Sequence, residues 1–280
     1  MIYVLLAVLT GAGKVTQSAL TKMAGEKGVQ GGTFFFNAAK AGSVGVLLFL
    51  ITLSSFSFHL PTFWYAVVYT VSLALSMVFG YLALLRGPMS LTSAIVAYSA
   101  VMPCAYSILV LNEPLTLWKG IGLGLLFFAV YLLRKEETGS KQKEKHWLWY
   151  LVLTFLFTGF CSVIQKQHQA VYPGEYCNEF SVLSFVFTAA IFLLLGLLRR
   201  ERSPAASLVY SLPAGLFMGL ASYLTLFLSS RMEGSLLFPL VTVTQTILNL
   251  LLSMLLFRER LCPRQIVGLV LGLFSILLIR

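Results

Sequence analysis

The sequence predicts an all-α membrane protein with ten transmembrane helices, arranged as two inverted five-helix repeats. Three observations lead to this fold class. The 280 residues are 58% hydrophobic and only 11% charged, whereas a soluble domain is about 45–50% apolar and about 25% charged. The apolar residues fall into ten blocks, most of them close to the ~20 residues that cross ~30 Å of hydrocarbon. A single long polar run, residues 135–146, separates the blocks into two sets of five.

The ten blocks are the predicted spans, and each is expected to be helical because backbone groups cannot stay unpaired in lipid. In the first half the spans are 2–21, 33–54, 63–85, 89–111 and 117–133. In the second half they are 147–169, 180–198, 206–229, 234–257 and 265–279. No basic region precedes the first block, so we interpret it as a transmembrane helix and not as a cleaved signal peptide.

The two halves align locally, which indicates an internal duplication. The matched positions are Thr10, Gly11 and Gln17 with Thr158, Gly159 and Gln165, and Glu113 and Gly122 with Glu259 and Gly268. We therefore divide the chain into a first repeat (1–134), a polar linker (135–146) and a second repeat (147–280). Five spans per half invert the second repeat relative to the first, an arrangement common in secondary transporters.

Lysine and arginine in the loops predict the orientation, because cytoplasmic loops carry an excess of them. Fourteen of the twenty lie in loops on the side of the linker, four lie on the opposite side, and Lys14 and Lys40 lie inside spans. The linker is therefore expected to be cytoplasmic and both termini to be outside, in a multi-pass protein of the plasma (cell inner) membrane.

These features together resemble the drug/metabolite transporter superfamily, in its ten-helix EamA-type branch. The most specific element is a leucine-rich helix end, then Glu, then a glycine-containing final helix, seen at Glu113 before Gly122 and again at Glu259 before Gly268. The resemblance covers essentially the whole chain. It implies ten helices, a central substrate cavity and alternating access. Some relatives place both termini in the cytosol, whereas the charge count here places them outside.

Polar residues at helical spacing predict the walls of that cavity. Residues at i, i+3, i+4 and i+7 share one helix face, and in lipid a polar face must turn toward protein or water. The first span carries Thr10, Lys14, Gln17, Ser18 and Thr21 in this pattern. The predicted substrate-binding residues are Lys14, Gln17, Asn37, Lys40, Tyr98, Gln165, Tyr223, Gln245 and Asn249. The alternative is that these side chains only hold helices together.

Lys14 and Lys40 are the most informative of these residues. A lysine inside a span costs a few kcal/mol and needs water or a partner, yet no Asp or Glu lies well inside any span. A substrate carboxylate or phosphate could supply the partner. Two alternatives stay open at this point: neutral amines, and a Lys40 side chain that snorkels to the interface.

Further residues are expected to shape or gate the helices. Glu113 and Glu259 precede the fifth and tenth spans, where a carboxylate complements the positive end of a helix; a gating ion pair is the alternative. Pro103 removes a backbone hydrogen bond within the fourth span and could act as a hinge. Gly122 and Gly268 belong to glycine patterns that permit close helix packing, within the chain or in a homodimer.

The predicted function is a secondary or facilitative transporter for a small polar or amphipathic metabolite, in contact with the lipid bilayer. The alternatives are a lipid-linked carrier or flippase for an anionic headgroup, and a membrane scaffold that transports nothing. We expect no enzymatic activity, cofactor or metal, since the sequence contains no hydrolase triad or phosphate-binding glycine loop, and its four cysteines have no metal-ligand spacing. The basic residues form no continuous stripe, so no nucleic-acid partner is expected.

Overall fold

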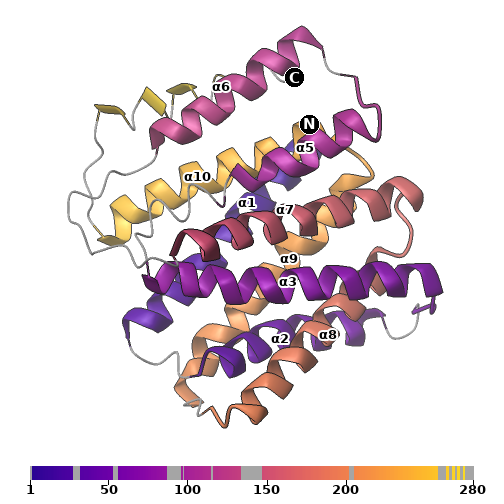
Figure 1. Cartoon of the computed structure of the whole chain (residues 1–280), viewed down its shortest axis with the longest axis vertical. Coiled ribbons are helices and arrows are strands. Elements are labelled where there is room, and N and C mark those ends of the chain that lie inside the picture. Colours follow the sequence, from indigo (N-terminus) through magenta and orange to yellow (C-terminus); the bar gives the residue numbers. More distant parts are fainter. Residues whose placement is uncertain are drawn as a thin grey trace. The chain divides into compact units, whose positions relative to one another are not determined.

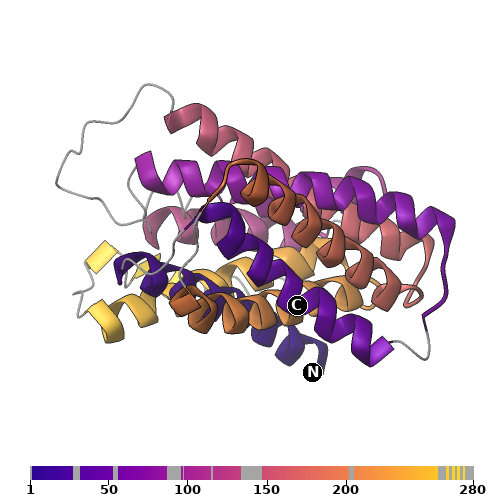
Figure 2. The ribbon, with the colours of Figure 1, turned by 90° about the horizontal axis from the view of Figure 1, so that it is seen from below.

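The computed structural model describes residues 2–27, 32–52, 56–86, 96, 98–114, 116–133, 147–201, 205–257, 263–264, 267–268, 270–271 and 274. Throughout these residues the regular structure is helical and contains no strand (Figures 1 and 2). Six of the described helical segments are long and apolar enough to cross a membrane, which confirms an all-α, multi-pass membrane protein. The count of ten helices and the inverted repeat stay predictions.

The helix bounds follow the predicted spans closely. In chain order the elements are α1 (Ile2–Glu26), α2 (Thr33–Thr52), α3 (Leu60–Arg86), η1 (Tyr98–Ala100), α5 (Val101–Leu109), α6 (Leu117–Leu133), α7 (Trp147–Val171), α8 (Cys177–Leu198), η2 (Ala205–Ser207), α9 (Leu208–Ser229) and α10 (Gly234–Phe257). Most of the predicted span 265–279, and residues 89–95 of the fourth span, lie outside the described residues.

The chain forms two compact units that do not coincide with the two sequence halves. Unit 1 consists of Met1–Ala74 and Gln167–Arg231, and unit 2 consists of Leu75–Lys166 and Met232–Arg280. Each unit therefore takes segments from both sides of the polar linker, and α3 and α7 each contribute to both units. The boundaries of the predicted repeats stay a prediction based on sequence symmetry.

In unit 1, α9 packs against α1, α2 and α8, and α2 also packs along α8 (Figure 1). Aromatic side chains fill the contact between α2 and α8: the rings of Phe34 and Phe192 lie 6.2 Å apart. A Cβ added to Gly196 of α8 would lie 3.3 Å from the ring of Phe35. Small residues on one helix thus make room for large ones on the other, which gives a dense interior.

In unit 2, α10 packs against α5 and α6. The parts of α3 and α7 in this unit meet through stacked rings, with Phe79 6.1 Å from Phe157 and 6.3 Å from Tyr150. The hydroxyls of Ser76 and Thr158 share a 2.6 Å hydrogen bond between the same two helices. Polar side chains therefore find partners inside the helix pair and not in lipid.

Candidate functional site

The polar face of α1 is largely satisfied by its own helix. The hydroxyls of Thr10, Ser18 and Thr21 each donate a 2.9 Å hydrogen bond to the carbonyl four residues earlier. Such back-bonding is the usual solution for hydroxyl side chains within a helix. These three residues are therefore weak candidates for substrate contact, whereas the half-buried side chains of Lys14 and Gln17 make no such bond.

On α2, the predicted residues Asn37 and Lys40 are both buried. The Asn37 amide donates to the Thr33 carbonyl oxygen at 3.0 Å. The Lys40 side chain is only 5% exposed. Among the described residues, no hydrogen bond or ion pair reaches the amine of Lys40 or that of Lys14. The two lysines singled out by the sequence thus stay without a described counter-charge.

Helix α9 places these two lysines at one level of unit 1. A Cβ on Gly13, next to Lys14, would lie 3.2 Å from the Phe217 carbonyl oxygen. On another face of α9, Gly215 lies so close to the Lys40 carbonyl that a Cβ there would collide with it. Gly215 and Phe217 are two residues apart, or about 3 Å along the helix axis. Lys14 and Lys40 therefore lie on two helices that both pack against the same turn of α9.

The carboxylates that could neutralise these lysines are engaged elsewhere in unit 1. Glu201 accepts hydrogen bonds from the backbone amides of Phe34 at 2.8 Å and Phe35 at 3.4 Å, and so caps the start of α2. Glu179 accepts from the backbone amide and the hydroxyl of Ser57, both at 3.2 Å. Both contacts place negative charge at helix ends, where free amide groups stabilise it.

The other predicted substrate residues are distributed over both units. Tyr223 belongs to unit 1 and is half-buried; Gln165 and Gln245 belong to unit 2, where Gln165 is buried and Gln245 half-buried. Tyr98 and Asn249 lie in helical segments, but their side chains are outside the described part of the structure. The predicted set is therefore described as two separate groups, of which the lysine group of unit 1 is the better defined.

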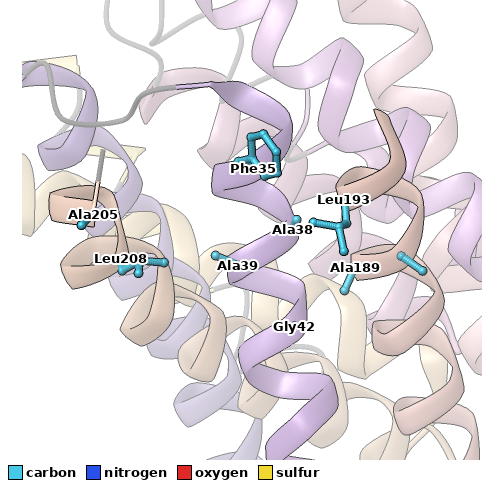
Figure 3. Close-up of a pocket in the computed structure, with 9 residues that line it drawn as sticks. Phe35, Ala38, Ala39, Gly42, Ala189, Leu193, Ala205 and Leu208 are labelled. Atoms are coloured by element: carbon cyan, nitrogen blue, oxygen red, sulfur yellow. The ribbon is translucent and has the colours of Figure 1, made fainter. Parts of the chain in front are cut away.

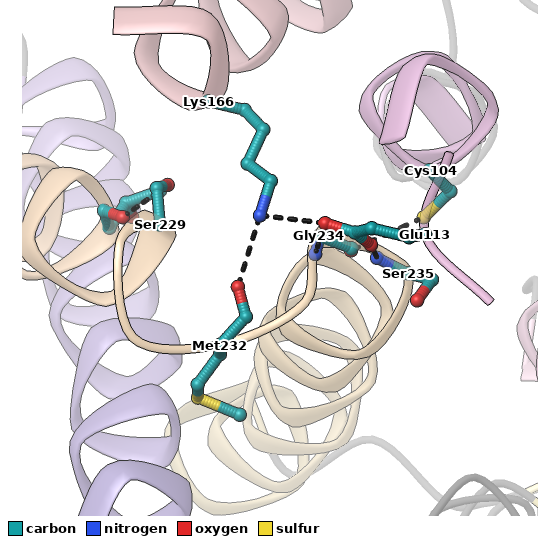
Figure 4. Close-up of polar contacts among 8 residues, drawn as sticks. Cys104, Glu113, Lys166, Ser229, Met232, Gly234 and Ser235 are labelled. Carbon is teal, nitrogen blue, oxygen red and sulfur yellow. Dashed lines mark hydrogen bonds and ion pairs between the residues drawn. The ribbon is translucent and has the colours of Figure 1, made fainter. Parts of the chain in front are cut away.

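A second polar cluster in unit 2 is centred on Glu113, in the segment between α5 and α6 (Figure 4). Its carboxylate forms an ion pair with the Lys166 amine at 2.8 Å. The same carboxylate accepts hydrogen bonds from the backbone amides of Gly234 at 2.9 Å and Ser235 at 3.2 Å. Lys166 also donates to the Met232 carbonyl oxygen at 3.1 Å. One carboxylate thus joins α7 to the first turn of α10.

This geometry corrects the helix assigned to Glu113. The sequence placed the carboxylate at the start of the helix that follows it, which is α6, but its hydrogen bonds go to the start of α10. The chain turns at Asn112, whose φ of 53° is left-handed, just before Glu113. Burial raises the pKa of Glu113, but the bonds from Lys166, Gly234 and Ser235 outweigh it and hold that pKa below 4.5. Glu259 lies outside the described residues.

The remaining predicted structural residues take ordinary packing positions. Pro103 is buried in the first turn of α5, where a missing N–H costs little because the first amides of a helix have no partner within it. Gly122 is buried in α6, and Gly268 is buried in one of the short described segments beyond α10. A hinge at Pro103 and a packing role for the two glycines stay predictions.

An apolar pocket of about 580 Å³ lies on unit 1 among α2, α8 and the η2–α9 junction (Figure 3). Its lining consists of Phe35, Ala38, Ala39, Gly42, Ala189, Ala190, Leu193, Ala205 and Leu208. On α2, residues 35, 38, 39 and 42 share one face, and Asn37 and Lys40 lie on the opposite one. The pocket is therefore separate from the lysine group and contains no charged or polar side chain.

The described helices and the buried polar clusters define a multi-pass α-helical membrane protein. The second half, residues 145–280, matches the EamA-like transporter family. This half of the chain is therefore similar to that family. Over residues 145–280 the match agrees with the resemblance to the drug/metabolite transporter superfamily.

A comparison with solved structures supports the fold over the full length. A structure described only as "Crystal structure of protein" superposes with a TM-score of 0.77, covering 98% of this chain and 97% of that chain. The sequences are 16% identical, so this likeness shows the fold alone. No curated protein matches the chain.

Proposed function

We propose that this protein is a secondary or facilitative transporter that moves a small polar metabolite carrying a carboxylate or phosphate. The observation that supports this proposal is Lys40, 5% exposed in α2 without a counter-charge among the described residues. Lys14 on α1 is half-buried and likewise has no counter-charge among the described residues. An anionic group on the substrate would supply the negative counter-charge that neither amine has among the described residues.

The energetics favour a functional reason for these lysines. A lysine at the centre of a membrane helix costs about 2.5–3.5 kcal/mol on insertion scales, and two of them would lower the stability of unit 1 noticeably. Glu179 and Glu201 do not offset that cost, because their carboxylates bind the backbone amides of Ser57 and Phe34. A substrate anion bound beside Lys40 would offset the cost of that lysine whenever the site is occupied, and Asn37 would add a hydrogen bond.

The transport cycle that fits is alternating access, in which the loaded site faces one side of the membrane and then the other. The predicted inverted repeat supplies the symmetry for such a cycle. Lys14, Gln17, Asn37, Lys40 and Tyr223 would form the part of the substrate site that belongs to unit 1. The energy of the cycle would come from the substrate gradient or a coupled ion.

A lipid-linked substrate has the same headgroup charge, but the described geometry does not favour it. A flippase needs a polar headgroup site that continues into an apolar groove for the acyl chain. The apolar pocket lies on the face of α2 opposite Asn37 and Lys40, so it does not continue from the lysine group. We therefore propose a water-soluble substrate.

The test is ligand-dependent stability, followed by transport. Purified protein in detergent is heated with inorganic phosphate, succinate or neutral mannitol, and in a separate arm with phosphatidylglycerol. A true ligand at 100 times its Kd stabilises the folded state by about 2.7 kcal/mol. We expect phosphate or succinate to raise the melting temperature, and Lys40→Gln to abolish that rise. The same variant should lose uptake of the active anion into proteoliposomes.

Lys27→Gln is the matched control. Lys27 is exposed at the end of α1, 5.4 Å above the ring of Tyr210, and its loss should leave the anion response intact. If only phosphatidylglycerol stabilises the protein through Lys40, the flippase alternative replaces a soluble substrate. If no anion responds, or if Lys40→Gln responds like the parent protein, the proposed substrate site is wrong.

A further inference from the structure

The apolar pocket of unit 1 is a groove that opens at the surface of the helices (Figure 3). Its floor is made of small residues, among them Ala38 and Gly42 of α2 and Ala189 of α8. Its rims are large and exposed, since Leu193 is 48% and Leu208 is 43% exposed. On helices that span a membrane, an exposed apolar groove of this kind is a site for a ligand or a lipid chain.

The groove lies close to one end of its helices. On α2 it runs from Phe35, the third residue of that helix, to Gly42, or about 10 Å along the axis. On α8, Leu193 stands six residues before Arg199, which ends the helix, or about 9 Å from it. The hydrocarbon core is about 30 Å thick. The groove therefore occupies the outer part of one leaflet, at the level of the upper half of an acyl chain.

The same end of unit 1 carries exposed positive charge. Arg199 and Arg200 follow α8 and are both exposed, and the Arg199 guanidinium lies 5.0 Å above the ring of Phe34. The amine of the exposed Lys27 lies 5.4 Å above the ring of Tyr210, which is two residues from the groove rim at position 208. Neither arginine forms an ion pair with another described residue. Cations thus stand at headgroup level, just beyond the groove.

The backbone fixes the turn that presents these arginines. The amide of Arg200 donates to the Leu197 carbonyl and the amide of Glu201 to the Gly196 carbonyl, both at 3.1 Å. This pair of bonds is the Schellman ending of a helix, in which glycine usually takes the left-handed position. Here Arg200 takes it, with a φ of 51°. The Glu201 carboxylate is bound to the amide of Phe34, so it does not pair with the arginines.

The combination selects one class of occupant. A soluble metabolite would find no polar side chain in the groove, and a neutral lipid would leave the arginines without a partner. Two copies of the chain in the same orientation would bring both sets of arginines together, without a free described carboxylate between them. The charge count predicts that this end faces the cytoplasm, where the leaflet is rich in anionic lipids and basic sites between helices bind their headgroups.

We propose that this end of unit 1 binds an anionic phospholipid of the surrounding bilayer. One acyl chain lies in the groove between α2, α8 and the start of α9, and the phosphate of the headgroup contacts Arg199 and Arg200. Binding is reversible and involves no covalent step. The lipid would hold α2, α8 and α9 together at the end where their own side chains leave the groove open.

The first test compares headgroups on identical chains. Purified, delipidated protein in detergent is titrated with dioleoyl phosphatidylglycerol or dioleoyl phosphatidylcholine, and bound lipid is counted by native mass spectrometry. We expect the phosphatidylglycerol to bind at least fivefold more tightly. Arg199→Gln and Arg200→Gln should each reduce that affinity about fivefold. Arg231→Gln is the matched control, because this exposed arginine follows α9 at its far end. Equal affinity for the two lipids, or equal losses in all three variants, would overturn the proposal.

The second test fills the groove. Ala190 lines it and is exposed, so Ala190→Phe should fold normally while occupying the space of the chain, and Ala190→Leu is a smaller replacement if it does not. We expect severalfold weaker phosphatidylglycerol binding. Val68→Phe, at a 46% exposed position of α3, should leave the affinity unchanged. An unchanged affinity in the Ala190 variant would show that the chain lies elsewhere.

The lipid site is independent of the proposed transport site. Lys40→Gln should retain the full preference for phosphatidylglycerol, and inorganic phosphate, which has no chain, should not displace the lipid. If Lys40→Gln removed the preference while both arginine variants kept it, the lipid would bind at the lysine group and this inference would be wrong.

Discussion

The ion pair between Glu113 and Lys166 allows a quantitative test of the structure of unit 2. The two side chains are only 12% and 7% exposed, so the pair belongs with buried ion pairs and not with surface pairs. Removing one member of such a pair leaves an uncompensated charge and costs about 3–5 kcal/mol. Glu113→Gln should fall at the lower end of that range, because the amide oxygen can still accept from Gly234 or Ser235.

A double-mutant cycle separates the pair from its surroundings. The free energy of unfolding in mixed detergent micelles is measured for the parent protein, Glu113→Gln, Lys166→Gln and the double variant. Residues in one hydrogen-bonded network couple by about 0.5–3 kcal/mol, and the 2.8 Å separation puts the expected coupling in the upper half of that range. Glu175→Gln, at an exposed position of the α7–α8 turn, should change stability by less than about 0.5 kcal/mol.

A coupling energy below about 1 kcal/mol, the value for an exposed pair, would contradict this reasoning. It would mean that Glu113 acts mainly as a cap for α10, and that other contacts, among them the Met232 carbonyl, hold Lys166 in place.

Two further predictions concern the pH dependence that Glu113 confers and the contact between α2 and α9. The pKa of Glu113 is lowered in the folded state, so its contribution to stability is complete above pH 4.5 and is lost as the pH falls through the lowered pKa. Acid titration should therefore reduce the free energy of unfolding less in Glu113→Gln than in the parent protein. Gly215→Ala should lower the free energy of unfolding by about 1–3 kcal/mol, since the new Cβ collides with the Lys40 carbonyl. Gly120→Ala, whose Cβ would meet nothing within 4 Å, should be neutral or stabilising by up to about 1 kcal/mol; equal losses in both variants would refute the α2–α9 contact.

The helices could be predicted from the sequence because hydrocarbon imposes a length and a composition on each of them. The predicted span 33–54 and the observed α2, Thr33–Thr52, agree within two residues, and the predicted span 234–257 coincides with α10. The resemblance of residues 145–280 to the EamA-like transporter family could likewise be recognised, because the Glu-and-glycine pattern is local in sequence.

The partners of individual polar residues could not be predicted in the same way. Glu113 and Lys166 are 53 positions apart, and the local sequence around either residue does not predict the other as its partner. His59 and His168 looked unrelated in the sequence, yet both bond to Thr62. The sequence predicts Glu113 at the start of α6, but the left-handed turn at Asn112 directs its carboxylate to α10. Such pairings depend on the tertiary fold, which periodicity does not encode.

Unit 1 is built from segments that lie on both sides of residues 135–146. This affects how the polypeptide could be divided into fragments. The bonds from Glu201 to Phe34 and from Glu179 to Ser57 connect stretches that precede and follow residues 135–146. A nick within residues 135–146 would leave these bonds intact, and the two fragments would remain associated. Either fragment produced alone would lack half of every compact unit and would expose helix faces that only its complement can cover.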